Sequence, residues 1–263
     1  MKEGVMLGTD RYAYRSKIKN IDPLHKLLIT LPVLLLCIFL DHWIISLLTL
    51  VGMTVVNLYF GKNSLSEVMH MLSIPMGFIL IGTLTVILGR YTQGDGILLG
   101  LRLGSSYFGI TSQSLMRGFE LIVKSMGVMS TVYFYVMNTT ISDLSVAMEK
   151  LRVPRLFTEM MELIYRFIFV LMESAGKIRT AQNSRLGYKD FRTSYRSTGT
   201  LAARVFVDAM RRSDKIYSAL DSRGYQGQIL MPDIRYEKNS AMIVAGISMA
   251  ALQIIIFVIL RSL

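Results

Sequence analysis

Long apolar stretches separated by short polar segments dominate the first half of the chain. A helix needs about 20 mostly apolar residues to cross a hydrocarbon core of about 30 Å. On this criterion four stretches are predicted to span a membrane: residues 27–40, 43–60, 71–89 and 111–140. The first is short, but Lys26 can reach the headgroups at one end and Asp41 suits the other. A fifth stretch, the twenty uncharged residues 241–260, is the clearest span.

Two segments interrupt this pattern. Residues 90–111 contain five glycines and few charges, and they predict an outside loop, with or without a short hairpin. Residues 142–239 contain 17 Lys or Arg and 11 Asp or Glu. So many cations indicate a cytoplasmic segment, which in turn places the N-terminus inside and the C-terminus outside. The prediction is therefore an all-α polytopic membrane protein with about five transmembrane helices and a cytoplasmic domain of long helices.

The boundaries of three parts follow from this topology: a four-span membrane domain over 1–140, a cytoplasmic domain over 141–239 and a last transmembrane helix over 240–263. Within the cytoplasmic part, Asp143 is expected to cap a short helix. A long helix is predicted over 156–185, with Gly187 placed to end it. A polar linker over 189–199 and a second helix over 200–222 follow.

A short repeat links the ends of these two cytoplasmic helices. Residues 177–185 (KIRTAQNSR) match residues 215–223 (KIYSALDSR) at an offset of 38, and each copy is followed by Gly and Tyr. An arginine in the last helical turn can simply offset the negative helix end, worth about 0.3–1 kcal/mol. An arginine paired inside an interface can instead cost about 2–5 kcal/mol when truncated. Two matched tips favour docking, and they suit a partner that is a dimer of like subunits.

Five segments carry a resemblance to a known family: DRYAY at 10–14, DP and KL at 22–27, LIYRFIF at 163–169, AQNSRLGY at 181–188 and ALDSRGY at 219–225. Together they resemble the transmembrane T components of energy-coupling factor transporters, the EcfT/CbiQ family, and most closely its cobalt-type members. The resemblance spans nearly the whole chain.

The resemblance implies roles for particular residues. In that family a small residue, an arginine and a small or apolar residue dock each coupling helix onto one ATPase subunit. The corresponding triplets here are Ser184, Arg185 and Leu186, and Ser222, Arg223 and Gly224. Tyr165 and Arg166 are candidates for a hinge near the membrane, although Tyr and Arg are equally typical of residues anchored at a membrane surface.

Partners and cargo are implied in the same way. We expect two ATP-binding subunits and a CbiM-like substrate-binding membrane component, with or without a CbiN-like small subunit. ATP-driven closure of the ATPases would move the helix tips and reorient that component, importing cobalt ions across the cell membrane for cobalamin biosynthesis. Import of nickel or a vitamin stays open, as do a membrane scaffold and a membrane-embedded enzyme. The candidate residues for such an enzyme are Asp41, His42, Glu120 and Lys124.

Composition and short motifs bear on three further kinds of function: nucleic-acid binding, metal or cofactor binding, and ATP hydrolysis. The net charge of +11 fits cation-rich inside segments, and no segment interleaves basic and aromatic residues as a nucleic-acid-binding protein does. Cys37 is the only cysteine, and the three histidines, His25, His42 and His70, occur singly, so neither a metal site nor a cofactor is predicted. No phosphate-binding loop is present, so ATP hydrolysis is expected in partner subunits and the chain itself is not expected to be an enzyme.

Overall fold

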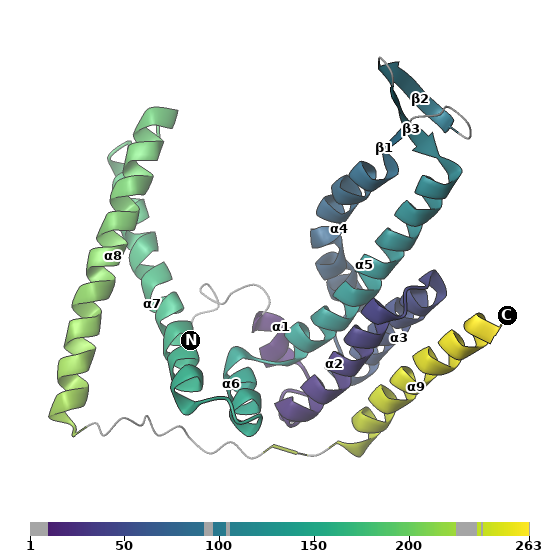
Figure 1. Ribbon diagram of the computed structural model, residues 1–263. Helices are drawn as coiled ribbons and strands as arrows, with labels where there is room; N and C mark the ends of the chain where they lie inside the picture. The colour runs from purple at the N-terminus through teal and green to yellow at the C-terminus, as the bar shows by residue number, and fades with distance from the viewer. Residues whose placement is uncertain (1–9, 92–96, 104–105, 225–235, 238, 263) are drawn as a thin grey trace. The chain divides into compact units, whose positions relative to one another are not determined.

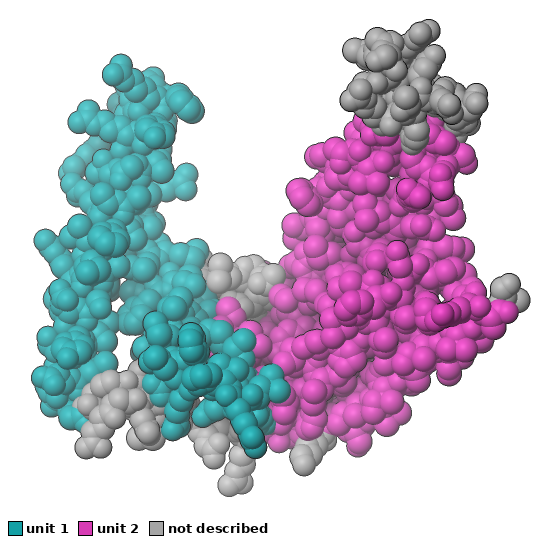
Figure 2. Space-filling model, viewed as in Figure 1, with its two compact units in different colours: residues 1–7, 148–235 teal, residues 8–147, 236–263 magenta. Residues whose placement is uncertain are grey.

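The chain is almost entirely helical in a computed structural model that describes residues 10–91, 97–103, 106–224, 236–237 and 239–262 (Figure 1). The predicted all-α membrane architecture is confirmed. The residues form two compact units, coloured separately in Figure 2. We call residues 8–147 with 236–263 the membrane unit, and residues 1–7 with 148–235 the hairpin unit. The segment 92–96, inside the glycine-rich stretch, and Tyr225, which ends the second repeat copy, lie outside the described residues.

Each predicted span corresponds to a helix of the membrane unit. These helices are α2 (Pro23–Phe39), α3 (Trp43–Gly61), α4 (Leu65–Ile87), α5 (Ser112–Asn138) and α9 (Ser240–Ser262). The last four are long and apolar enough to cross a membrane. Helix α2 has 17 residues, about 25 Å at 1.5 Å per residue, so it is shorter than the others. A count of five spans therefore depends on α2.

Side-chain caps explain where several of these helices begin. The Asp22 carboxylate accepts a hydrogen bond from the Leu24 amide at 3.0 Å, and Pro23 occupies the first turn of α2, where no N–H is needed. Ser64 and Glu67 form a capping box that starts α4 six residues before the predicted span. At the start of α5 the Thr111 amide donates to the Ser114 hydroxyl at 2.9 Å.

A small antiparallel sheet connects α4 to α5. Its strands are β1 (Gly89–Tyr91), β2 (Ile97–Leu103) and β3 (Ser106–Thr111), in the order β1-β3-β2. Gly89 lies opposite Gly109 in the first pair, and Gly100 lies opposite Gly109 in the second. In Figure 1 the sheet sits at the far ends of α4 and α5. The hairpin that was left open for residues 90–111 is present as the β2–β3 pair, and β1 adds a third strand that was not predicted, because glycines weaken strand propensity.

Close helix packing in the membrane unit depends on small residues. A Cβ on Gly246 of α9 would collide with Ile29 of α2, and a Cβ on Gly127 of α5 would lie 2.6 Å from the Ser46 carbonyl oxygen of α3. Polar groups also join the helices in the interior. The buried Gln253 amide of α9 donates to the Thr49 hydroxyl of α3 at 2.7 Å. Such interhelical hydrogen bonds and small-residue contacts are typical of membrane helices.

A buried polar cluster closes one end of the membrane unit. The Lys26 ammonium, fully buried, donates to the Asn138 carbonyl at 2.7 Å, and the Ser16 hydroxyl donates to the Asn138 side-chain oxygen at 2.6 Å. The Asn138 amide donates in turn to Asn57 at 3.0 Å. The cluster joins the start of α2 to the ends of α3 and α5, so Lys26, one of the residues that carry the resemblance, has a structural role.

Two polar contacts fix the ends of helices in the membrane unit. Lys124 of α5 forms an ion pair with Asp41 at 2.7 Å, beyond the end of α2. Helix α6 (Ile141–Lys150) begins before Asp143, which lies in its first turn rather than at its cap. The Asp143 amide donates to the Thr140 hydroxyl at 3.2 Å, so Thr140 takes the capping position.

The hairpin unit consists mainly of two long antiparallel helices, α7 (Arg155–Ser184) and α8 (Phe191–Ser222). The predicted linker over 189–199 is wrong from residue 191 onward, because α8 begins there and has 32 residues. Hydroxyl side chains bond to the preceding turn, as Thr198 does to the Ser194 carbonyl at 2.8 Å. The Gln182 amide of α7 also donates to the Ser197 carbonyl at 3.0 Å. The contact with Gln182 offsets the weak helix propensity of Ser, Thr and Gly199, whereas hydroxyl bonds to the preceding turn do not strengthen a helix.

Candidate coupling site

The tip of α7 ends in a tight, fully hydrogen-bonded turn. Arg185 is the C-cap, and Leu186 follows in left-handed backbone with φ 58°. The Leu186 amide donates to the Asn183 carbonyl at 3.0 Å, and the Gly187 amide donates to the Gln182 carbonyl at 2.9 Å. These two bonds define a Schellman motif. The left-handed residue is thus Leu186, not Gly187, whose own Cβ would lie 2.8 Å from the Gln182 carbonyl oxygen.

The tip of α8 repeats this geometry. Arg223 is the C-cap, and Gly224 follows in left-handed backbone with φ 68°. The Gly224 amide donates to the Asp221 carbonyl at 2.9 Å. In both tips the serine before the arginine donates to the carbonyl four residues earlier, at 3.2 Å for Ser184 and 2.8 Å for Ser222. The sequence repeat therefore corresponds to two like helix ends.

All six residues of the two triplets are solvent-exposed in the structure. Leu186, an apolar residue, is 68% exposed. Each arginine also lies at the carbonyl end of its helix, where the helix dipole favours a cation. The tips are therefore available to a partner.

The antiparallel arrangement separates the two tips along the hairpin. Arg185 lies where α7 turns into α8, whereas Arg223 lies beside Arg166 and Phe167, in the first half of α7. Each tip lines its own cleft between the two helices. We call these the α7-tip cleft, which contains Arg185, and the α8-tip cleft, which contains Arg223.

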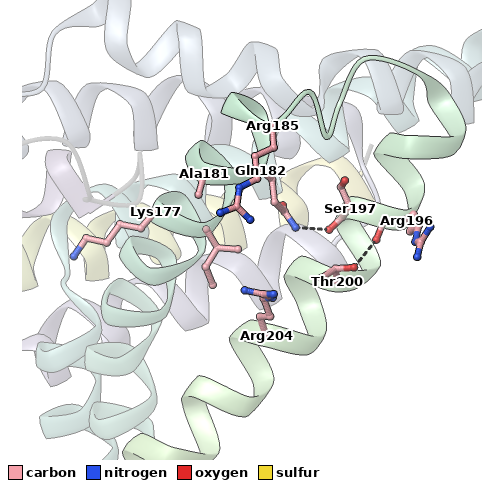
Figure 3. Close-up of a pocket in the computed structure, with 9 residues that line it drawn as sticks. Lys177, Ala181, Gln182, Arg185, Arg196, Ser197, Thr200 and Arg204 are labelled. Carbon is pink, nitrogen blue, oxygen red and sulfur yellow. Dashed lines mark hydrogen bonds between the residues drawn. The ribbon is translucent and has the colours of Figure 1, made fainter.

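The α7-tip cleft is strongly basic. Its cations are Lys177, Arg185, Arg196 and Arg204, and none of its nine lining residues, all within the described part of the chain, is Asp or Glu. In Figure 3 the guanidinium groups of Arg185 and Arg204 point into the cleft from opposite helices, whereas the Lys177 side chain points away. Two guanidinium groups facing one space favour an acceptor with oxygen atoms between them.

The family of the chain is decided by comparison with known proteins. The family model CbiQ, described as "Cobalt transport protein", matches residues 14–233, which include both tips. The chain belongs to the CbiQ family. The expected resemblance to the EcfT/CbiQ family is thereby confirmed.

Relatives of this CbiQ-family chain extend over most of its length. The cobalt transport protein CbiQ of Salmonella typhimurium is 31% identical over 224 residues, which cover 84% of this chain and 98% of the relative. The energy-coupling factor transporter transmembrane protein EcfT of Lactococcus lactis is 25% identical over 260 residues, which cover 92% and 94%. A putative fused cobalt transport protein CbiMQ of Methanocorpusculum labreanum is 31% identical over 164 residues, 62% of this chain and 27% of the relative.

The candidate hinge pair of the CbiQ-family motif LIYRFIF divides between two environments. Tyr165 is 8% exposed and contacts Phe169 edge-on, with ring centroids 5.0 Å apart. Arg166 is exposed and lines the α8-tip cleft with Arg223. The structure thus places Arg166 and Arg223 in one cleft, while the hinge role of Tyr165 and Arg166 stays a prediction.

Sequence reasoning missed a polar contact where α7 and α8 cross. The Ser174 hydroxyl of α7 donates to the Asp208 carboxylate of α8 at 2.7 Å, and Arg212 donates to the same oxygen at 3.1 Å. These bonds, first that from Ser174, lower the pKa of Asp208 below its usual value. The signal was present as polar residues four apart on one face of α8, at 196, 200, 204, 208 and 212. Only Arg196 of this set lay in the predicted linker, and which face of α8 meets α7 does not follow from the spacing alone.

Three of the four candidate enzyme residues, Asp41, His42 and Lys124, have structural partners. His42 accepts a hydrogen bond from the Ile44 amide at 3.3 Å and so caps α3, and Asp41 holds Lys124. Among the residues described here, His, Cys, Asp and Glu do not gather in groups of three or more that could hold a metal ion.

Proposed function

We propose that this chain is the transmembrane coupling subunit of an energy-coupling factor importer for cobalt ions. In this proposal two ATP-binding subunits dock on the tips of α7 and α8. One subunit binds the first triplet, Ser184, Arg185 and Leu186. The other binds the second triplet, Ser222, Arg223 and Gly224. ATP binding closes the two subunits, moves the tips and shifts α7 against α8. That motion reorients a CbiM-like substrate-binding component in the membrane, accompanied or not by a CbiN-like subunit.

The observation that carries the proposal is the pair of like, exposed helix ends. Each presents an arginine at the C-cap, followed by a left-handed residue, and the two lie at opposite ends of one hairpin. A partner made of two like subunits offers two like binding sites, and tips at opposite ends of the hairpin can occupy both sites at once. A single capping role would not explain why residues 177–185 recur at 215–223.

The cargo assignment rests on the relatives. The family description and the Salmonella relative both name cobalt transport, and the fused relative combines CbiM and CbiQ in one chain. These names support cobalt and a CbiM-like partner here. The EcfT relatives support the wider class, in which nickel or a vitamin is the alternative cargo.

The proposal also assigns the orientation of the chain in the membrane and the subunits that hydrolyse ATP. The N-terminus and the hairpin unit lie in the cytoplasm, and the cell membrane is crossed by the helices of the membrane unit. This orientation is supported by the 17 Lys or Arg residues between 142 and 239. ATP hydrolysis belongs to the partner subunits, because the chain has no phosphate-binding loop, and its own role is mechanical.

Affinity capture of the ATPase subunits tests the docking. The Arg185→Ala/Arg223→Ala variant is expected to lose capture and cobalt uptake together, since truncating an interfacial arginine costs about 2–5 kcal/mol. A matched control is Arg117→Ala/Arg261→Ala, which removes two exposed arginines from membrane-unit helices. Capture and uptake at wild-type levels in the tip variant would refute the proposal. Capture without uptake in the wild-type complex would indicate a scaffold.

A further inference from the structure

The chain passes between its two units at two places, and one hydrogen bond within the membrane unit joins the residues next to them. The chain leaves the membrane unit after residue 147 and returns to it at residue 236. Asp143 lies on α6, shortly before the chain leaves. Tyr236 is the first residue of the return, and its hydroxyl donates to the Asp143 carboxylate at 2.9 Å. This bond therefore closes a loop of chain that contains residues 148–235.

Asp143 is a fixed acceptor for this bond. It is only 8% exposed, and its second carboxylate oxygen accepts from the Thr140 hydroxyl at 2.8 Å. The buried Lys26 ammonium, which donates to the Asn138 carbonyl, also attracts the carboxylate. A hydrogen bond to an ionised group is about twice as strong as one between neutral groups. The Tyr236 hydroxyl is thus held by a buried charge whose own position is set by other contacts.

The residue after Tyr236 is held by backbone bonds. The Glu237 amide donates to the Asn20 carbonyl at 3.0 Å, and the Asp22 amide donates to the Glu237 carbonyl at 3.2 Å. Glu237 thereby forms a parallel bridge with Ile21. Asp22 in turn caps α2. The returning chain is therefore joined to α6 by a side chain and to the start of α2 by its backbone.

We propose that Asp143 and Tyr236 are positioning residues for coupling, because their hydrogen bond makes the chain that returns from the hairpin unit move together with α6 and the start of α2. We call this bond, together with the backbone bonds of Glu237, the return clamp. The inference rests on the proposed coupling function and adds residues outside both docking triplets. Coupling travels through contiguous hydrogen-bonded and packed elements, so a displacement of the hairpin unit reaches the membrane helices through the return clamp.

The return clamp is not needed to begin the helix that follows it. The Asn239 side-chain oxygen accepts a hydrogen bond from the Met242 amide at 3.2 Å, which caps α9 separately. The Gln253 amide then ties α9 to Thr49 of α3. Loss of the return clamp is therefore expected to leave the membrane helices folded and to affect the transmission of motion.

Cobalt import per ATP hydrolysed, measured in proteoliposomes that contain the assembled complex, tests the return clamp. Tyr236→Phe removes the donor and keeps the ring, and it is expected to lower this ratio at least about twofold while ATPase capture stays at the wild-type level. Tyr195→Phe, at a tyrosine of α8 that is 79% exposed, is the control. A ratio equal to that of the control would overturn the inference. So would a loss of ATPase capture in Tyr236→Phe, because the residue would then act on docking or folding.

A second pair of variants tests the backbone bonds of the return clamp. Glu237→Pro removes the amide that donates to Asn20, whereas Glu237→Ala keeps it. Only the proline variant is expected to lower cobalt import per ATP. Equal ratios for the two variants would count against the return clamp.

Hydrogen exchange reports on the return clamp without any transport measurement. The Asp22 amide, which bonds to the Glu237 carbonyl, is expected to exchange about tenfold faster in Tyr236→Phe, because a hydrogen bond to a charged group is lost beside it. The same amide in Tyr195→Phe should exchange as in the wild type. Unchanged exchange of the Asp22 amide in Tyr236→Phe would show that the side-chain and backbone bonds do not act together.

The docking proposal and the return clamp fail in different ways. If the Arg185→Ala/Arg223→Ala variant still captures the ATPases, the docking proposal is wrong. If that variant loses capture while Tyr236→Phe and Glu237→Pro import as much cobalt per ATP as their controls, docking stands and the inference about the return clamp is wrong.

Discussion

Leu186 and Gly224 follow the tip arginines and occupy the same left-handed backbone region, at φ 58° and 68°. Glycine adopts this region without strain, but a residue with a Cβ loses about 1–2 kcal/mol there. The α7 tip thus has a strained apolar residue at this position, whereas the α8 tip has an unstrained glycine. In the proposed interface, Leu186 would recover that energy by contact with the partner.

Replacing Leu186 with glycine is expected to stabilise the free α7 tip by about 0.5–1 kcal/mol. Hydrogen exchange of the Gly187 amide, which bonds to Gln182, should slow by a factor of about 2–5. Leu186→Ala is the control and should show no such gain, because alanine keeps the Cβ. Faster exchange in Leu186→Gly than in Leu186→Ala would contradict the strain argument.

At the level of elements, the contact between α7 and α8 includes one polar bridge, from Ser174 to Asp208 with Arg212 on the same carboxylate oxygen. Both donors favour the ionised carboxylate, so the pKa of Asp208 is lower in the folded protein than in the unfolded chain. Stability from this bridge is therefore present above the ordinary pKa and is lost as the pH falls through the lowered value.

Comparing the melting temperatures of wild type and Asp208→Asn across pH tests this bridge. The wild type is expected to be more stable at neutral pH, and the difference should shrink once the pH falls below the usual aspartate value of 3.8. The control, Asp214→Asn, replaces an exposed carboxylate on the same helix and should show no such pH dependence. A difference in melting temperature between wild type and Asp208→Asn that grows as the pH falls would contradict a stabilising role of the ionised Asp208 carboxylate.

The elements also show what the sequence could predict. Apolar length located the membrane helices, and the helix-forming run before Gly187 located α7 to within one residue at each end. The start of α8 was predicted nine residues too late, because Ser, Thr and Gly199 have weak helix propensity and are stabilised by contacts with α7. The triplets came from the repeat and the resemblance, whereas the residues that line the clefts opposite them, such as Arg204 and Phe167, depend on the pairing of two helices, which a single sequence does not reveal.

For the whole molecule, polar and apolar groups are placed as a bilayer requires. Lys26, Asn57 and Gln253 are buried in the membrane unit, whereas Phe78 and Ile81 of α4 are 82% and 68% exposed. Water would disfavour so many exposed apolar side chains, but lipid does not. The membrane unit therefore fits a lipid environment.

Cysteine labelling of single-site variants tests this topology. Cys37, the native cysteine, is fully buried, so a maleimide is not expected to react with it. A membrane-impermeant maleimide added to intact cells is expected to label Ser262→Cys at the end of α9 and to leave Tyr195→Cys in α8 unlabelled. Inverted vesicles should reverse the pattern. Labelling of Tyr195→Cys from outside would place the hairpin unit on the wrong side for ATPases.

The most direct test of the central claim is photo-cross-linking from the two tips in the assembled complex. A photoreactive phenylalanine at position 184 or 222 is expected to cross-link to an ATPase subunit, whereas the same group at exposed position 206 should not. Cross-links from both tips to the ATPases are the predicted result. Cross-links from both tips only to this chain's own helices or to another membrane subunit, in a complex that contains the ATPases, would contradict the account.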